Sequence, residues 1–428
     1  MNRLLLAISF LLLASISFGQ PAVKFLNSTE ARRIESILSS DSMQGRKTGT
    51  AGIDRAADFI SNEFKKIGLK TFNNANGYQQ PFTMVKPTQL TISGTFDGQA
   101  IEAKNMVVFT PARQLDVNEQ AGFKKVYIKA GGNVIREAQQ IIAQKENVLV
   151  LVDTSFSKTF PILQRLKRTL FKSMGNAVFV LTQKDPKIFN ILVTHEFEEQ
   201  QLANVVGVLP GKSKKSEYVI FSAHYDHLGI GKPVNGDSIY NGANDDAAGT
   251  AAVIMLAKYY KALGKNKRTL IFTTFTAEEI GGFGSEYFSH QLDPAKVVAM
   301  FNIEMIGTES KWGKASAYIT GYEKTNMGAI LEKNLQGSAF RFYPDPYTDQ
   351  QLFYRSDNAT LARLSVPAHT ISTSKMDYEP NYHKVTDEIG TLDMENMAEV
   401  IKAIAISARS IVNGKDTPSR VNTADLTR

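Results

Sequence analysis

Residues 217–227 read E-Y-V-I-F-S-A-H-Y-D-H, an apolar run followed at once by two histidines and an aspartate. A short run rich in valine, isoleucine and aromatic residues is typical of a buried β-strand. The chain has only six histidines, so two of them at the end of one strand need an explanation. A polar turn is the simplest interpretation, and a metal-binding histidine supported by a carboxylate is the alternative.

The same pattern recurs in the second half of the chain. Apolar runs cover residues 268–275, 297–303 and 367–373, and acidic residues or a histidine follow each of them. A further pair of aspartates opens the helical pattern that ends at Gly264. The side chains concerned are Asp226, Asp245, Asp246, Glu278, Glu279, Glu304 and His383.

Alternating strand and helix patterns from residue 203 onward predict an α/β fold with an open, mostly parallel sheet and helices on both faces. The carboxyl ends of parallel strands share one edge of such a sheet, and sites form at that edge. We therefore expect these ionisable side chains to converge.

Converging carboxylates repel one another unless a cation neutralises them. Two histidines with several acids, in a chain without cysteine, suit zinc or another borderline divalent ion. The set holds more ligands than one zinc with an open position uses, which favours two metals about 3.5–4 Å apart. A glutamate left over beside a ligand glutamate would serve as the general base.

Each residue taken alone has a simpler explanation. Asp246 is a typical helix N-cap, and Glu278 and Glu279 could stabilise the start of a helix. Glu304 could pair with a buried cation, and His383 could be a loop histidine. Because all of them follow strands of one predicted edge, we favour a common site.

Five motifs together resemble the M28 family of metallopeptidases, which comprises two-zinc aminopeptidases and related carboxypeptidases. The motifs are S-A-H-Y-D-H-L-G, G-A-N-D-D-A-A-G, T-A-E-E-I-G-G-F-G-S, N-I-E-M-I-G and Y-H-K-V-T-D. The resemblance covers roughly residues 30–90, including M-Q-G-R-K-T-G-T-A-G, and 200–412. It implies the zinc exopeptidase fold and two Zn²⁺ per chain.

The resemblance also implies how the two zinc ions are held. Asp245 would bridge both ions. His224 and Glu304 would complete one site, and Glu279 and His383 would complete the other.

Further roles follow from the same resemblance. Glu278 would act as general base and acid, and Asp226 would orient His224. Tyr382 would donate a hydrogen bond to the developing oxyanion, and His227 would be a structural neighbour.

The function expected from this resemblance is removal of N-terminal residues from peptides. Aminopeptidases of the family usually have aspartate where this chain has Glu304, so a carboxypeptidase or a dipeptidase is an alternative. A single-zinc glutaminyl cyclase shares the fold, but the full ligand set and the Glu278–Glu279 pair argue against it. Retention of Glu278 and all ligands also argues against a non-catalytic binding protein.

The domain organisation predicted from the sequence has three parts. Residues 1–19 have the charge, apolar core and small-residue exit of a signal peptide. Residues 20–90 and 199–428 would form the catalytic domain. Residues 91–198 would form a smaller inserted α/β domain, where many M28 relatives carry a protease-associated domain.

Composition narrows the partners and the compartment. The net charge is +7, but basic residues are scattered and no aromatic–basic interleaving favours nucleic-acid binding. No segment after residue 19 is long and apolar enough to span a membrane. We therefore expect a secreted or periplasmic protein that acts on peptides, without stable membrane insertion after signal cleavage.

Overall fold

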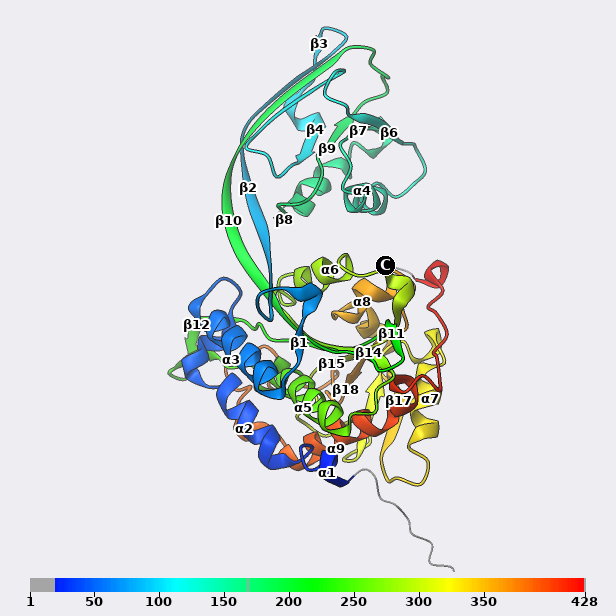
Figure 1. Cartoon of the computed structure of the whole chain (residues 1–428). Coiled ribbons are helices and arrows are strands. Elements are labelled where there is room, and N and C mark those ends of the chain that lie inside the picture. The colour runs from blue at the N-terminus through cyan, green and yellow to red at the C-terminus, as the bar shows by residue number, and fades with distance from the viewer. Residues whose placement is uncertain (1–19, 168, 427–428) are drawn as a thin grey trace, which may run out of the picture. The chain divides into compact units, whose positions relative to one another are not determined.

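The computed structural model describes residues 20–167 and 169–426 (Figure 1). The predicted signal peptide, residues 1–19, lies outside the described residues. The chain divides into two compact units, unit 1 with residues 1–80 and 204–428 and unit 2 with residues 81–203. Unit 2 contains the predicted insert, and the chain enters and leaves it through the long strands β2 (Gln79–Phe96) and β10 (Phe189–Leu209).

Unit 1 is built on four central parallel strands. In spatial order they are β14 (Arg268–Phe275), β11 (Lys214–His224), β15 (Val297–Ile303) and β18 (Ala368–Ser372). The sheet continues on one side with β10, antiparallel to β14. On the other side lie β16 (Ser316–Ile319), antiparallel to β18, and β17 (Arg341–Pro344).

Helices cover both faces of this sheet, as alternate residues of the strands show. Val219 and Phe221 of β11 belong to one apolar core, which includes most of α5 (Ala248–Leu263). Ile220, between them, belongs to a second core with Phe288 of α6 (Phe283–Ser289). The predicted α/β class is therefore confirmed.

Two helices of the first core end at a glycine. α3 (Ala51–Ile67) ends at Gly68, whose φ of 75° is the left-handed conformation that favours glycine. α5 likewise ends at Gly264, with φ 57°. The other helices of this layer are α2 (Ser28–Leu38), α7 (Met327–Asn334) and α9 (Met394–Ser407), while α8 (Asn358–Ala362) packs on β18 and β15.

Unit 2 has a four-stranded sheet of its own. The strand order is β4 (Met106–Phe109), β9 (Ala177–Leu181), β7 (Val148–Val152) and β6 (Lys124–Ile128). β6, β7 and β9 run parallel, and α4 (Val134–Ala143) connects β6 to β7. A hairpin at Asp97–Gly98 joins β2 to β3 (Gln99–Ala100).

Candidate metal centre

The predicted edge of the unit 1 sheet brings the expected residues together. β11 ends at His224, which pairs in register with Phe275, the last residue of β14. Glu278 and Glu279 follow β14, and Glu304 directly follows β15. The aspartate pair enters from a short π-helical turn, η6 (Ala243–Ala247), which precedes α5.

One group of possible ligands consists of His224, Asp245 and Glu304, which offer atoms within 4.8 Å of one another. His224 Nε2 lies 3.1 Å from Asp245 Oδ1. Among the described residues, neither His224 Nε2 nor the buried Oε2 of Glu304 has a satisfactory hydrogen bond. Buried polar atoms normally have a bonding partner. A metal ion bound between these side chains would supply one.

The second group of possible ligands includes Glu279 and His383, which lie near the other oxygen of Asp245. His383 Nε2 lies 3.3 Å from Asp245 Oδ2 and 3.1 Å from Glu279 Oε2. Asp245 therefore directs Oδ1 toward His224 and Oδ2 toward His383. A carboxylate whose two oxygens face two separate ligand groups has the arrangement that a bridge between two metals requires.

His227 lies closer to this second group than the sequence interpretation expected. Its Nδ1 is 2.7 Å from Glu279 Oε1 and 3.9 Å from Asp245 Oδ2. His227, Asp245 and Glu279 meet the same distance condition for metal binding as the first group. Glu279 is thus held between His227 on Oε1 and His383 on Oε2. The signal in the sequence was the second histidine of H-Y-D-H.

Asp226 was predicted to orient His224, and its carboxylate makes its hydrogen bonds elsewhere. The atom closest to His224 Nδ1 is the backbone carbonyl of Asp226, at 3.1 Å, whereas carboxylate Oδ1 lies 3.8 Å away. The carboxylate instead accepts hydrogen bonds from the backbone amides of Glu278, at 3.1 Å, and Glu279, at 3.3 Å. Asp226 therefore ties the strand end of His224 to the two glutamates.

Two further aspartates fix the backbone around Asp245. Asp246 accepts hydrogen bonds from the amides of Gly249 in the first turn of α5 and of Met305 beyond β15. The N-cap residue of α5 is Ala247, so Asp246 bonds to the first turn from one position before the N-cap. Asp387, to which the sequence assigned no role, accepts from the amides of Asn244 at 2.8 Å and Asp245 at 3.0 Å. Its place in the motif Y-H-K-V-T-D was the available signal.

The charges at this edge are mostly carboxylates buried close together. Burial raises the pKa of Asp226 to about 6 and that of Asp357 to about 7. For Glu278, burial and repulsion from Glu304 outweigh the attraction of His224 and raise the pKa well above its usual range. Burial opposes a charged His224, but Asp245 and the other acids outweigh it and raise its pKa. Such a cluster favours binding of divalent cations.

Tyr382 lies beside the second group of possible ligands, because it precedes His383 in the chain. Its ring stacks on that of His383, with centroids 3.9 Å apart. Burial and the nearby carboxylates of Asp245 and Glu304 raise the pKa of the phenol, so it remains a hydrogen-bond donor at neutral pH.

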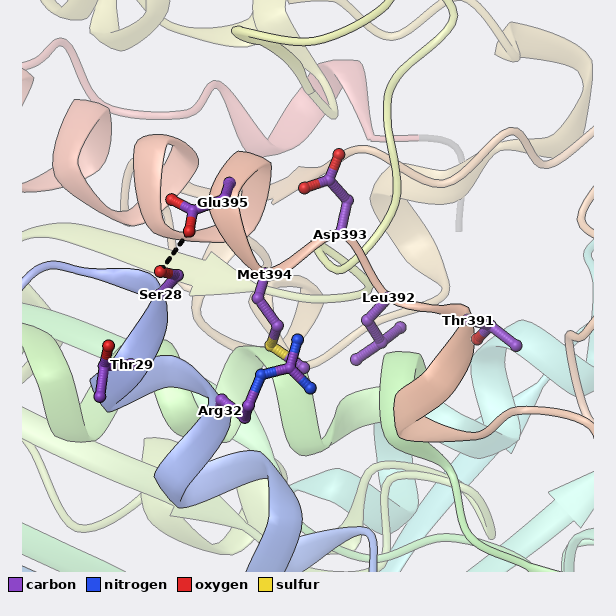
Figure 2. Close-up of a pocket in the computed structure, with 8 residues that line it drawn as sticks. All are labelled: Ser28, Thr29, Arg32, Thr391, Leu392, Asp393, Met394 and Glu395. Carbon is purple, nitrogen blue, oxygen red and sulfur yellow. Dashed lines mark hydrogen bonds between the residues drawn. The ribbon is translucent and has the colours of Figure 1, made fainter.

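A different cavity of unit 1 contains none of the expected site residues. Figure 2 shows it between the first turns of α2 and α9, with a volume of about 510 Å³. Ser28 and Glu395 hydrogen-bond across it, and Arg32 and Asp393 lie on its wall. Nothing in this cavity resembles the two metal-ligand groups.

Known proteins resemble the part of the chain that carries this site. Residues 204–407 match the family model described as peptidase family M28. Leucine aminopeptidase 1 of Trichophyton rubrum is 26% identical over 220 residues, which cover 49% of this chain and 57% of that protein. The chain spans about half the length of the curated relatives that it matches first.

Solved structures show the same fold over most of the chain. An aminopeptidase from Aneurinibacillus sp. strain AM-1 superimposes with a TM-score of 0.54 at 18% identity, covering 94% of this chain and 96% of that one. A zinc aminopeptidase from Bacillus subtilis also gives a TM-score of 0.54, at 15% identity, and covers 90% of this chain and 95% of its own. Residues 204–407, which carry all the expected ligands and the expected general base, are therefore similar to peptidase family M28.

Proposed function

We propose that this protein is a two-zinc exopeptidase that hydrolyses N-terminal residues from peptides. The observation that carries the proposal is the position of Asp245, whose two oxygens face His224 and His383 separately. His224 and Glu304 would hold one ion, and Glu279 and His383 the other. His227 would support Glu279 through the 2.7 Å contact of Nδ1 with Oε1.

Two zinc ions at this site would supply Lewis acidity for the peptide carbonyl and lower the pKa of a water. Glu278 would accept a proton from the attacking water and donate it to the leaving amine. Burial raises the pKa of Glu278, which makes its carboxylate a stronger proton acceptor and supports this role. Tyr382 would donate its phenolic hydrogen to the oxyanion that forms at the carbonyl.

N-terminal polarity is supported by the acidic character of the site. A free ammonium group of the substrate would be attracted by carboxylates such as Glu304. The alternative, recognition of a C-terminal carboxylate, needs a cation at the site. Arg355, next to Ser356, is the candidate, and it is exposed with one long hydrogen bond of 3.4 Å, to Gln350.

The test of polarity compares one peptide in free, N-acetylated and C-amidated forms. Acetylation removes the ammonium charge, so we expect it to abolish cleavage, while amidation should have little effect. Loss of cleavage on amidation with full activity on the acetylated peptide would instead establish a carboxypeptidase.

We also propose that the protein is exported, with residues 1–19 acting as a cleaved signal peptide. The composition of that segment supports this. Within the described residues, no helix is sufficiently long and apolar to cross a bilayer. N-terminal sequencing of the protein from its native host should find a chain that begins near residue 20. A chain that retains Met1 would contradict export by this route.

A further inference from the structure

Arg46 is a buried cation outside the region that matches the family model. Its side chain has 0% exposure, and although buried carboxyls such as Glu35 and Asp387 attract it, none of the described ion pairs includes Arg46. A guanidinium remains charged in proteins and has five N–H donors in a fixed planar arrangement. A buried arginine without an ion pair therefore indicates that these donors meet acceptors of another kind.

The acceptors are four backbone carbonyls. Nη1 donates to Leu38 O at 2.7 Å and to Asn241 O at 2.6 Å, while Nη2 donates to Gly242 O at 2.8 Å. Nε donates to Tyr225 O at 2.8 Å. Tyr225 lies between the expected ligand His224 and Asp226, whereas Asn241 and Gly242 lead directly into the turn that carries Asp245. One side chain thus binds two of the segments that supply the expected ligands, those of His224 and Asp245.

Residues 46–48 make further contacts with the same segment. His227 N donates to Arg46 O at 3.2 Å, and Lys47 forms an isolated parallel bridge with His227. Thr48 Oγ1 donates to Asp226 Oδ2 at 3.2 Å. Residues 46–48 therefore run alongside residues 225–227 and hold them by backbone and side-chain bonds.

The turn that directs Arg46 inward is conformationally demanding. Gln44, Gly45 and Arg46 have φ values of 52°, 64° and 48°, all left-handed. A Cβ on Gly45 would lie 2.5 Å from Tyr240 O and 2.6 Å from Gly229 O, so glycine is required for this close approach. Non-glycine residues adopt this conformation only where surrounding contacts impose it, and such positions cluster at functional sites.

We propose that Arg46 is a positioning residue of the metal centre: through the carbonyls of Tyr225, Asn241 and Gly242 it fixes the separation between His224 and Asp245. The inference rests on the proposed metal site. Without the hydrogen bonds of Arg46, the end of β11 with His224 and the turn with Asp245 would move independently. Zinc binding would then have to order both segments, and this loss of entropy would weaken it. Zinc affinity should therefore depend on Arg46, although Arg46 contacts no metal.

Arg268 provides a matched control. It is also fully buried, at 1% exposure, and donates to Ile411 O, Asp416 O and Thr417 Oγ1 as well as to Glu217. None of these partners is an expected site residue. Substitution of Arg268 should therefore cost stability in a similar way while leaving the metal ligands in place.

The experiment measures zinc affinity of the full chain by competition with a chromophoric chelator, with thermal unfolding of the metal-free protein in parallel. We compare Arg46→Lys and Arg268→Lys with the unsubstituted protein. Both should lower the unfolding temperature, but only Arg46→Lys should weaken zinc binding, by about 10–100-fold, the usual effect of altering residues that support metal ligands. Unchanged zinc affinity in folded Arg46→Lys protein would overturn the inference.

If Arg46→Lys does not fold, Thr48→Val is a milder change that tests the same attachment of residues 46–48 to residues 225–227. It removes the hydrogen bond to Asp226, and zinc binding should weaken by several-fold. The control is Thr50→Val, which loses only a local bond to Lys47 O. Equal zinc affinities of these two variants would contradict the proposal. If the unsubstituted protein binds no zinc, the proposed function itself fails, which is a separate outcome.

Discussion

The sheets of the two units share a feature, parallel strands whose carboxyl ends lie along one edge, but the residues just beyond those ends differ. In unit 2, Lys129 comes directly after β6 and is exposed, while Asp153 comes directly after β7 and caps a short turn by accepting a hydrogen bond from the amide of Ser155. In unit 1, His224 and Asp226 at the end of β11 are almost completely buried. A parallel edge alone therefore does not make a site.

Burial of like charges is the feature that distinguishes the two edges. On the unit 2 edge, Asp153 is half-buried and its carboxylate accepts a hydrogen bond from the amide of Ser155. Asp245, at 2% exposure, and Asp226, at 0%, lie among other carboxyls where water cannot solvate them. The unit 1 edge therefore favours the binding of cations, and substitutions at the two edges can test this difference.

Removal of the shared carboxylate should have the largest effect. Asp245→Ala takes a ligand from both groups, so we expect the purified protein to lose both metals and all activity. Asp153→Ala, the corresponding change after a unit 2 strand, should leave metal content and activity unchanged. Elemental analysis of both proteins measures this, and retention of two zinc ions by Asp245→Ala would remove the basis for a bridging role.

Replacing the proposed base should affect rate but not metal. Glu278→Gln keeps the size of the side chain and its capacity to hydrogen-bond, but it cannot accept a proton. We expect kcat to fall by about 10²-fold or more, with zinc content and unfolding temperature close to those of the parent. Near-normal turnover of the zinc-loaded variant would assign the base to another residue.

A buried histidine away from the ligand groups gives a pH-dependent prediction. His369 in β18 donates from Nδ1 to Thr320 O and accepts from Thr325 at Nε2, and burial lowers its pKa to about 4. The unfolded chain, with a pKa near 6.5, binds a proton first as the pH falls. Stability is therefore lost from about pH 6.5 toward pH 4, by at most about 3 kcal/mol.

Urea unfolding of metal-free protein between pH 7 and pH 4 measures this loss. His369→Gln cannot take up the proton, so its free energy of unfolding should fall less steeply over that range than that of the parent. Parallel pH profiles for the two proteins would mean that His369 does not titrate as its burial implies.

Removal of unit 2 should have the smallest effect on the metal centre. The expected ligands and the hydrogen-bond partners named for them all belong to unit 1. A chain with residues 81–203 replaced by a short linker should therefore bind as much zinc as the full chain, provided that circular dichroism shows a folded protein. Loss of zinc from folded deletion protein would show that the two units are not independent in this respect.

Local patterns made much of unit 1 predictable. The apolar runs of β11 and β14, the helix stop at Gly264 and the polar residues after each strand are all encoded within short stretches of sequence. Because the carboxyl ends of parallel strands share one edge of a sheet, these patterns were enough to predict that the expected ligands lie together.

The contacts that the sequence did not reveal connect distant segments. Arg46 reaches carbonyls 179 and 196 positions away, and Asp387 binds amides more than 140 positions away. No periodicity or spacing encodes such contacts. The boundaries of unit 2 could not be predicted from the sequence either. β2 crosses the first boundary and β10 crosses the second, each as one continuous strand.

The most direct test of the account is the number of zinc ions bound per folded chain, measured by elemental analysis after titration of metal-free protein with zinc. Asp245 presents one oxygen to His224 and the other to His383, so the account predicts two ions per chain and full peptidase activity only when both are bound. Saturation at one zinc per chain, with full activity at that point, would contradict it.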